Sequence, residues 1–301
     1  MTNKHNPLSA HFRAPKLFTP LPSEGRFYDN TVVEMPETLE LPVFSMTAKD
    51  EMIMKNPDAL LNGEAVAQVI ESCVPNVKNA RAMMSSDIDV LLVAIQGATY
   101  GDEVEVTADC PECNEQQTGA ASVEAAIETM GRLEEVYTVE HDTLNIEIRP
   151  FTYSSTIQAG ITNFQSTRSL QALADVPDEM ERLRLFNDNF KKIAELNFSL
   201  IIDSVQSITL ADEEGKDIVV TDRDHIVEFL NNAENVVGKK IEEKIQDINS
   251  IGINHEMKMQ CEKCVDEDGN PNIAEYDKDE DGKIDVIAYD YDQDGDGFAT
   301  S

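Results

Sequence analysis

The stretch SDIDVLLVAIQGATYGDEVEVTADCPECNEQ, residues 86–116, decides the fold because its periodicity changes halfway along. Apolar residues recur at helical spacing over residues 86–97, and Gly101 ends that run. Residues 103–110 then alternate apolar and polar side chains, as a half-buried strand does. A helix followed by such a strand predicts an α+β chain, and this strand leads into a Cys-x-x-Cys pair.

Two cysteine pairs predict a metal site. Cys110 and Cys113 follow the strand, and Cys261 and Cys264 follow a second short alternating strand in INHEMKMQCEKC. Zinc prefers four soft ligands in a tetrahedron, and each Cys-x-x-Cys turn can point two thiolates at one ion. We therefore predict one structural zinc ion bound by all four cysteines, which leaves no open position for a catalytic water.

The predicted zinc ion would join two distant parts of the chain. Its knuckles lie at 110–113 and 261–264, so a helical insertion at 120–250 separates the halves of a discontinuous zinc ribbon. A redox role for CPEC and cysteines without a metal stay open as alternatives. The fifth cysteine, Cys73, lies at an apolar helix end and is predicted to be a small buried hydrophobic residue.

The insertion is predicted to be mostly helical. Asp178 is placed to cap a long helix that reaches about Val205, and its apolar stripe is expected to face the core. The residues of that stripe are Met180, Leu183, Phe186, Phe190, Ile193 and Ile201. Other expected elements are helices at 63–73 and 235–249, a hairpin around Gly215 and a helix opened by Thr221 with Asp224.

The composition restricts the class of partner. Lys and Arg number 24 against 58 Asp and Glu, which gives a formal charge of -34. Such a field repels the phosphates of nucleic acids and of anionic lipids. No apolar run approaches the roughly 18 residues of a membrane span. We expect no nucleic-acid partner, no membrane insertion and a location in the cytosol.

Motifs of the common enzyme classes are missing from the sequence. There is no phosphate-loop glycine pattern, nucleophile elbow or dinucleotide fingerprint, and HEMKM has Met259 where a zinc protease needs its second histidine. The sequence therefore predicts no catalytic residues and a protein that is not an enzyme.

The last 37 residues, 265–301, differ from the rest, with 13 acidic residues against two lysines. Asp-x-Asp-Gly recurs there every thirteen residues, and DKDEDGKID resembles a calcium loop without the acid at its twelfth position. Calcium binding and a solvated acidic tail without metal are both open interpretations. The candidate calcium ligands are Asp277, Asp279, Asp281, Asp285, Asp290, Asp292 and Asp294.

Three parts of the chain follow from these patterns. Residues 1–40 are rich in proline and predict an extended docking arm. Residues 41–264 predict a mostly helical α+β body that contains the zinc ribbon. Residues 265–301 form the acidic, Asp-rich tail.

An ordered series of motifs resembles a known family. LPSEGRFY (21–28), LPVFSMTAKDE (41–51), LLVAIQGATYGDEVEV and CPEC resemble the baseplate hub assembly proteins of T-even-type contractile-tail bacteriophages. The resemblance implies a non-enzymatic hub subunit or assembly factor whose partners are other phage baseplate hub proteins. It also implies a location in the host cytoplasm during assembly, and in the virion if the protein is a permanent subunit.

The resemblance also implies which residues bind partners. The first group is the docking segment, with Leu21, Pro22, Ser23, Gly25 and Tyr28. The second group lies in MTAKDE, where a helix is expected to begin, and we call it the boxed helix start; its residues are Met46, Thr47, Asp50 and Glu51. From the residues alone, Thr47 with Asp50 or Glu51 also predicts a helix cap. A metal-binding regulatory or structural protein unrelated to tail assembly is the alternative function.

Overall fold

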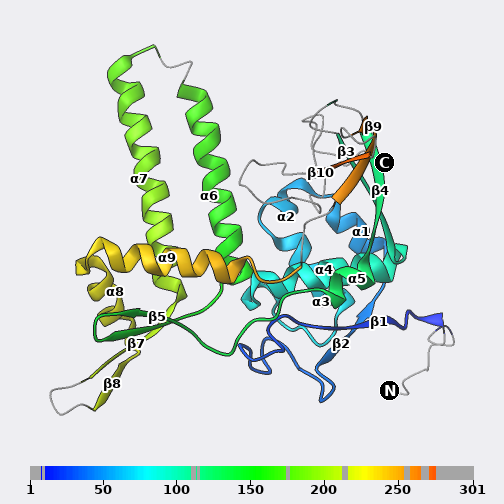
Figure 1. Cartoon of the computed structure of the whole chain (residues 1–301), viewed down its shortest axis with the longest axis horizontal. Coiled ribbons are helices and arrows are strands. Elements are labelled where there is room, and N and C mark those ends of the chain that lie inside the picture. The colour runs from blue at the N-terminus through cyan, green and yellow to red at the C-terminus, as the bar shows by residue number, and fades with distance from the viewer. Residues whose placement is uncertain are drawn as a thin grey trace, which may run out of the picture.

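The computed structural model describes residues 8, 11–109, 113, 116–173, 177–211, 216–253, 258–265 and 271–275, the last two ranges as backbone only. Helices and antiparallel strands are mixed along the chain, which confirms the predicted α+β class (Figure 1). The helices are α1 Ala48–Met54, α2 Pro57–Leu61, α3 Glu64–Cys73, α4 Ser85–Tyr100, α5 Val123–Glu128, α6 Tyr153–Ala172, α7 Glu179–Ser204, α8 Arg223–Asn232 and α9 Asn235–Asn249. The strands are β1 Pro15–Pro20, β2 Glu40–Phe44, β3 Glu103–Asp109, β4 Gln116–Ser122, β5 Tyr137–His141, β6 Leu144–Ile148, β7 Val205–Ala211, β8 Asp217–Val220, β9 Lys258–Val265 and β10 Pro271–Glu275.

An N-terminal unit is built around α4. The antiparallel pair β1 and β2 and the helix α3 pack against it and form one apolar core. α4 is buried on several sides, because a second apolar cluster covers Val90 and Val93 while the first covers Ile88 and Leu91. A helix that is apolar nearly all round belongs at the centre of a unit, and α4 takes that place. The predicted helices at 86–97 and 63–73 are confirmed as α4 and α3.

A C-terminal unit consists of an antiparallel sheet in the order β5-β6-β7-β8 and the helices above it. Side chains on β5 and β6 alternate, so that Val139, Ile146 and Ile148 point into a core shared with α8 and α9. The hairpin predicted around Gly215 is confirmed by the pairing of β7 with β8, although Gly215 itself lies outside the described residues.

The start and the end of the C-terminal unit meet. The amide of Gly131 donates to the carbonyl of Gly252 across 2.7 Å. Met130 and Ile253 beside them pack with Val90 of α4 in one small apolar cluster. The C-terminal unit is therefore inserted into the N-terminal one, and its two ends are fixed to the same place.

The helices α6 and α7 form a long hairpin that projects from the body (Figure 1). The predicted long helix is confirmed, and Asp178 caps it by accepting from the Met180 amide at 3.0 Å. The prediction of a core-facing stripe was wrong for its first half, because Met180, Leu183, Phe186 and Phe190 are exposed. Periodicity shows that side chains share a face of a helix, but it does not show that this face is covered.

Two further predictions need correction. The described part of residues 1–40 is no separate arm, because β1 pairs with β2 and Leu21 and Val33 are fully buried in the N-terminal core. The residue that caps α8 is Asp222 rather than Thr221, since its carboxylate accepts from the His225 amide at 3.1 Å.

Candidate functional site

The segment 21–28 folds into consecutive tight turns. Backbone hydrogen bonds run from Glu24 to Leu21, from Arg26 to Ser23 and from Tyr28 to Gly25. Gly25 has a φ of +79°, and a Cβ there would lie 2.3 Å from Cγ of Met35, so only glycine fits this position. The segment predicted as a docking surface therefore has a defined internal conformation.

A buried carboxylate holds this segment. Asp87, at the start of α4, accepts from the Ser23 amide at 3.0 Å and from the Ser23 hydroxyl at 2.5 Å. The Tyr28 hydroxyl also donates to Asp87, and it accepts from the Met84 amide at 2.7 Å. We call these four residues, Ser23, Tyr28, Met84 and Asp87, the Asp87 cluster. Asp87 and Ser23 are inaccessible to solvent.

The same segment also contacts the start of the C-terminal unit. The Pro22 carbonyl accepts from the Leu133 amide at 2.9 Å, and the Arg26 guanidinium donates to the Leu133 carbonyl at 3.1 Å. Leu133 and the half-buried Phe27 pack in the C-terminal core, whereas Leu21 and Tyr28 pack in the N-terminal one. Residues 21–28 therefore join the two units.

Burial controls the ionisation of the Asp87 cluster. Burial raises the pKa of Asp87 to about 6 from 3.8, although the hydrogen bonds from Ser23 and Tyr28 act in the opposite direction. Burial and then the charge of Asp87 raise the pKa of Tyr28 well above 10.0, so that this hydroxyl stays protonated and donates. The groups that hold the carboxylate are neutral, which is why they do not fully offset its desolvation.

The raised pKa predicts a dependence of stability on pH. Between pH 3.8 and about 6 the folded chain keeps a proton on Asp87 that the unfolded chain releases. The contribution of Asp87 to the free energy of unfolding therefore decreases as the pH rises through this window, by about 3 kcal/mol in total. The measurement is urea unfolding of the wild type and of Asp87→Asn from acid to neutral pH, because carboxylates that titrate in both proteins largely cancel in the difference. A difference that stays constant across the window would contradict the assignment.

A second buried carboxylate organises the boxed helix start. Asp50 accepts from the Thr47 amide at 2.8 Å, while the Thr47 hydroxyl caps α1 by accepting from the Asp50 amide at 3.3 Å. The predicted helix cap is thus confirmed with Asp50 rather than Glu51. Arg13, which the sequence reasoning missed, lies 3.5 Å from the Asp50 carboxylate and donates to the Ser72 carbonyl at 2.5 Å. It ties the chain before β1 to the end of α3.

The Arg13 guanidinium beside Asp50 makes the ionisation of this carboxyl group differ from that of Asp87. Burial raises the pKa of Asp50, but hydrogen bonds from Thr47 and Ser72 together with the Arg13 charge outweigh it, and the net pKa is lowered. The neighbouring Cys73 is fully buried, as predicted, and burial raises the pKa of its thiol to about 11. This thiol is therefore a packed core residue and no nucleophile.

Most of the residues with a predicted role in partner binding are buried or make contacts within the chain. Leu21, Pro22 and Ser23 are buried, Gly25 and Tyr28 shape the turns, and Asp50 is enclosed. Met46 packs against the N-terminal core, and the charge of Glu51 adds to burial in raising the pKa of Tyr100. Thr47 is exposed. Partner binding by these nine residues stays a prediction, and their observed contacts are internal.

The two cysteine pairs lie on neighbouring hairpins. β3 and β4 pair antiparallel on either side of Cys110 and Cys113, while β9 carries Cys261 and Cys264 and pairs with β10. β4 contacts β9, so that the two hairpins meet although the intervening units separate them along the chain (Figure 1).

The register of β9 is interrupted at its cysteines. Val265 pairs with Pro271, and Cys261 pairs with the next residue, Asn272, so three residues of β9 have no counterpart on β10. Cys110 and the side chains of Cys261 and Cys264 lie outside the part of the chain that the structure describes. Among the side chains that are described, no group of three or more His, Cys, Asp or Glu residues is placed to hold a metal ion.

The seven candidate calcium ligands between Asp277 and Asp294 lie outside the described residues. None of the helices that the structure describes combines the length and the apolar character of a membrane-spanning segment.

Comparisons with known proteins identify the family. Searches of the curated proteins and of the solved structures found no significant match. A family model, that of the T4 bacteriophage base plate protein, matches residues 28–272, which include the greater part of both units. Because this match covers well over half of the chain, the protein belongs to the family of T4 bacteriophage base plate proteins.

Proposed function

We propose that this chain is a non-enzymatic subunit or assembly factor of the baseplate hub, and that it acts through contacts with other baseplate hub proteins. The observation that carries the proposal is family membership over residues 28–272. Family membership supports a structural baseplate protein that is located in the phage tail. Two further parts of this proposal are that the chain belongs to the hub and that it acts in the host cytoplasm during assembly.

The internal contacts support a scaffolding role. The two buried carboxylates, Asp87 and Asp50, have their acceptor positions filled by hydroxyl, amide and guanidinium groups of the same chain. Such clusters fix the relative positions of helices and turns. The apolar surface that is exposed outside them supports contacts with other proteins.

Quantitative mass spectrometry of purified phage particles and of the matching infected-cell lysate tests the proposal, with a tail protein of known copy number as internal standard. A fixed small number of copies per particle identifies a hub subunit. Abundance in the lysate together with hub intermediates, but not in particles, identifies an assembly factor. Absence from both particles and hub intermediates would contradict either role and would favour the alternative metal-binding protein.

We also propose that the neighbouring cysteine hairpins share one structural zinc ion, with Cys110, Cys113, Cys261 and Cys264 as ligands. The contact between β4 and β9 and the interrupted register between Cys261 and Val265 support this site. Four thiolates fit the preference of zinc for a closed, tetrahedral sulfur site. The role would be to fix the two hairpins to each other.

Calcium binding by the acidic tail is a separate proposal that rests on the sequence repeat alone. Calorimetric titration of the full chain with calcium tests it, with Asp279, Asp281, Asp292 and Asp294 changed to Asn as the control. Equal heats for both proteins would leave the tail as a solvated acidic segment.

A further inference from the structure

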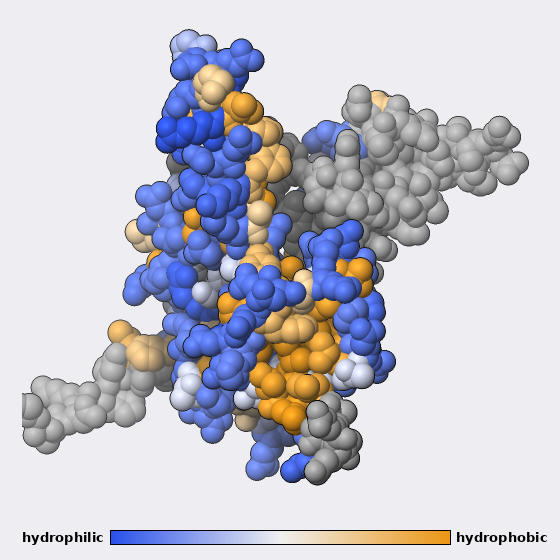
Figure 2. All heavy atoms as spheres, turned by 90° about the vertical axis from the view of Figure 1, so that its left-hand side faces the viewer, coloured by the Kyte–Doolittle hydropathy of each residue, from blue (hydrophilic) through white to orange (hydrophobic). Residues whose placement is uncertain are grey.

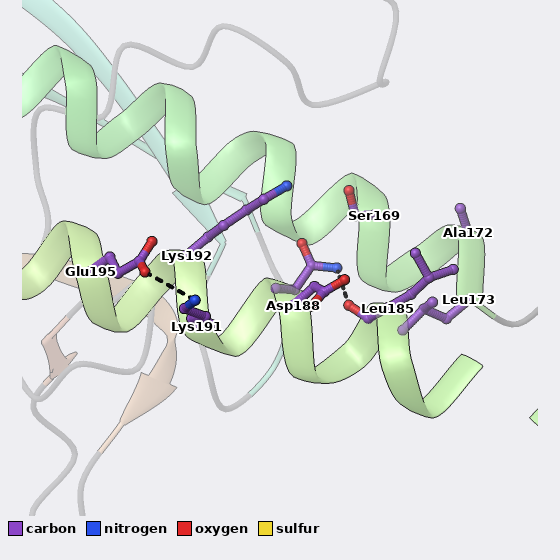
Figure 3. A pocket seen from close by; sticks show the side chains of 9 residues that line it. Ser169, Ala172, Leu173, Leu185, Asp188, Lys191, Lys192 and Glu195 are labelled. Atoms are coloured by element: carbon purple, nitrogen blue, oxygen red, sulfur yellow. Dashed lines mark hydrogen bonds and ion pairs between the residues drawn. The ribbon is translucent and has the colours of Figure 1, made fainter. Parts of the chain in front are cut away.

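The helix α7 has two apolar faces, and its own hairpin covers only one of them. Leu185 and Asn189 line the cleft between α6 and α7, together with Ala172 and Leu173 (Figure 3). This cleft has a volume of about 480 Å³, and Lys192 reaches across it from α7 toward α6. The helix α6 therefore packs on this face of α7.

The other face is the row Met180, Leu183, Phe186 and Phe190, which we call the outer row. Its side chains are between 42% and 74% exposed, and the rings of Phe186 and Phe190 lie with their centroids 4.7 Å apart. Figure 2 shows apolar surface in a strip along the hairpin, where the surrounding surface is hydrophilic. Four large apolar side chains side by side on one projecting helix indicate a contact surface rather than scattered exposure.

The spacing of the outer row indicates a helix as its partner. Leu183, Phe186 and Phe190 are separated by three and then four residues, and Ile193 continues the alternation. Spacing of three and four keeps a seam on one side of a helix and suits packing against a second helix at a small crossing angle.

The distribution of charge along the chain favours the same helix of a second copy as the partner. The helices α6 and α7 carry five basic and five acidic residues and are neutral, so the whole formal charge of -34 lies elsewhere in the chain. Two copies of the acidic body repel each other, but two hairpins do not. No member of the outer row is charged, and a surface without charge can face an identical surface about a two-fold axis at no electrostatic cost.

An antiparallel arrangement also keeps the acidic bodies apart. The axis would pass between Phe186 and Phe190, and about ten residues farther along α7, Phe198 packs in the C-terminal core. At 1.5 Å per residue the two C-terminal cores would lie roughly 30 Å apart along the helices, while Leu61 of the N-terminal unit lies on the α6 side of the hairpin. The Debye length at physiological salt is only about 8 Å, so most of the repulsion would be screened.

We propose that the outer row of α7 binds the same row of a second copy of this chain, antiparallel, so that two hairpins form a four-helix bundle. This goes beyond a role in the hub, because it concerns the contact of the chain with itself. It holds or fails whether or not the protein proves to be part of the hub.

Sedimentation equilibrium of the full-length chain, loaded with zinc, tests the proposal at several concentrations. The expected mass is that of two chains, and added salt should tighten the association because it screens the remaining repulsion between the bodies. A mass of one chain at every concentration would overturn the proposal.

Matched variants locate the contact. Phe190→Glu, at a side chain 56% exposed, is expected to weaken dimerisation about 100-fold, since aromatic residues at the centre of an interface dominate its energy. Phe18→Glu, at a phenylalanine 61% exposed on β1, is the control and should leave the dimer unchanged. Circular dichroism checks that both variants fold. Equal dimerisation of the two variants would place the contact elsewhere and overturn the proposal. A chain that stays monomeric but needs Phe190 to join hub intermediates would also overturn it, in favour of a different protein as partner.

Discussion

Replacing Asp87 with alanine is expected to lower the free energy of unfolding by about 3–5 kcal/mol, because it removes the acceptor of a buried cluster. The Ser23 amide, the Ser23 hydroxyl and the Tyr28 hydroxyl all donate to this carboxylate. Each buried donor that loses its acceptor costs about 1–3 kcal/mol, partly offset because a buried charge is removed as well. Urea denaturation of the full chain at neutral pH measures the change.

The matched control is Asp102→Ala. Asp102 also accepts two hydrogen bonds, from the Ser122 hydroxyl at 2.9 Å and the Glu124 amide at 2.7 Å, but it does so at an exposed position. Water can replace the lost acceptor there, so we expect a loss of about 1 kcal/mol or less. If the two alanine variants lose equal stability, the Asp87 cluster does not hold residues 21–28 against α4 in the way inferred from its burial.

Replacing Cys261 with serine is expected to reduce bound zinc from one ion per chain toward none and to destabilise the fold. Structural zinc sites of this kind contribute binding energies on the order of 10 kcal/mol in zinc-finger peptides, and here that energy would hold two hairpins in contact. Elemental analysis by mass spectrometry measures the metal, and thermal unfolding measures the fold.

The fifth cysteine supplies the control for this experiment. Cys73→Ala removes a thiol that is buried in the N-terminal core, far along the chain from both pairs, and should leave the zinc content unchanged. A wild-type chain without zinc, or a Cys261→Ser chain with unchanged metal and stability, would contradict the zinc proposal.

Local patterns predicted much of the secondary structure. The period of α4, the Asp178 cap of α7 and the Thr47 cap of α1 depend on residues close together in sequence, and the structure has all three. The helix α6 was missed because its many Ser, Thr and Gln residues give it little periodicity, and only Tyr153 and Ser166 are buried along it.

Long-range contacts could not be predicted in the same way. Nothing in LPSEGRFY shows that Ser23 and Tyr28 would meet Asp87, because that contact depends on how α4 packs. The only local signal was an acid at the start of a strongly apolar helix. Arg13 was similarly hidden, since an isolated arginine near the N-terminus has many possible partners. The placement of the outer row on an exposed hairpin depends on which side α6 covers, and the amphipathic pattern of α7 is the same in either case.

The joint made by residues 21–28 has a consequence for the order of folding during synthesis. Ser23 leaves the ribosome before Asp87, its acceptor 64 residues later, and Arg26 donates to a carbonyl 107 residues farther on. Contacts of such sequence separation form late, because the intervening chain must be ordered first. A nascent chain that stops before Leu133 lacks the partners of Arg26 and Phe27, although Leu21 and Tyr28 already have theirs in the N-terminal core. One side of the segment is therefore held early, and the side that carries Arg26 and Phe27 stays open to chaperones and proteases until the second unit has emerged.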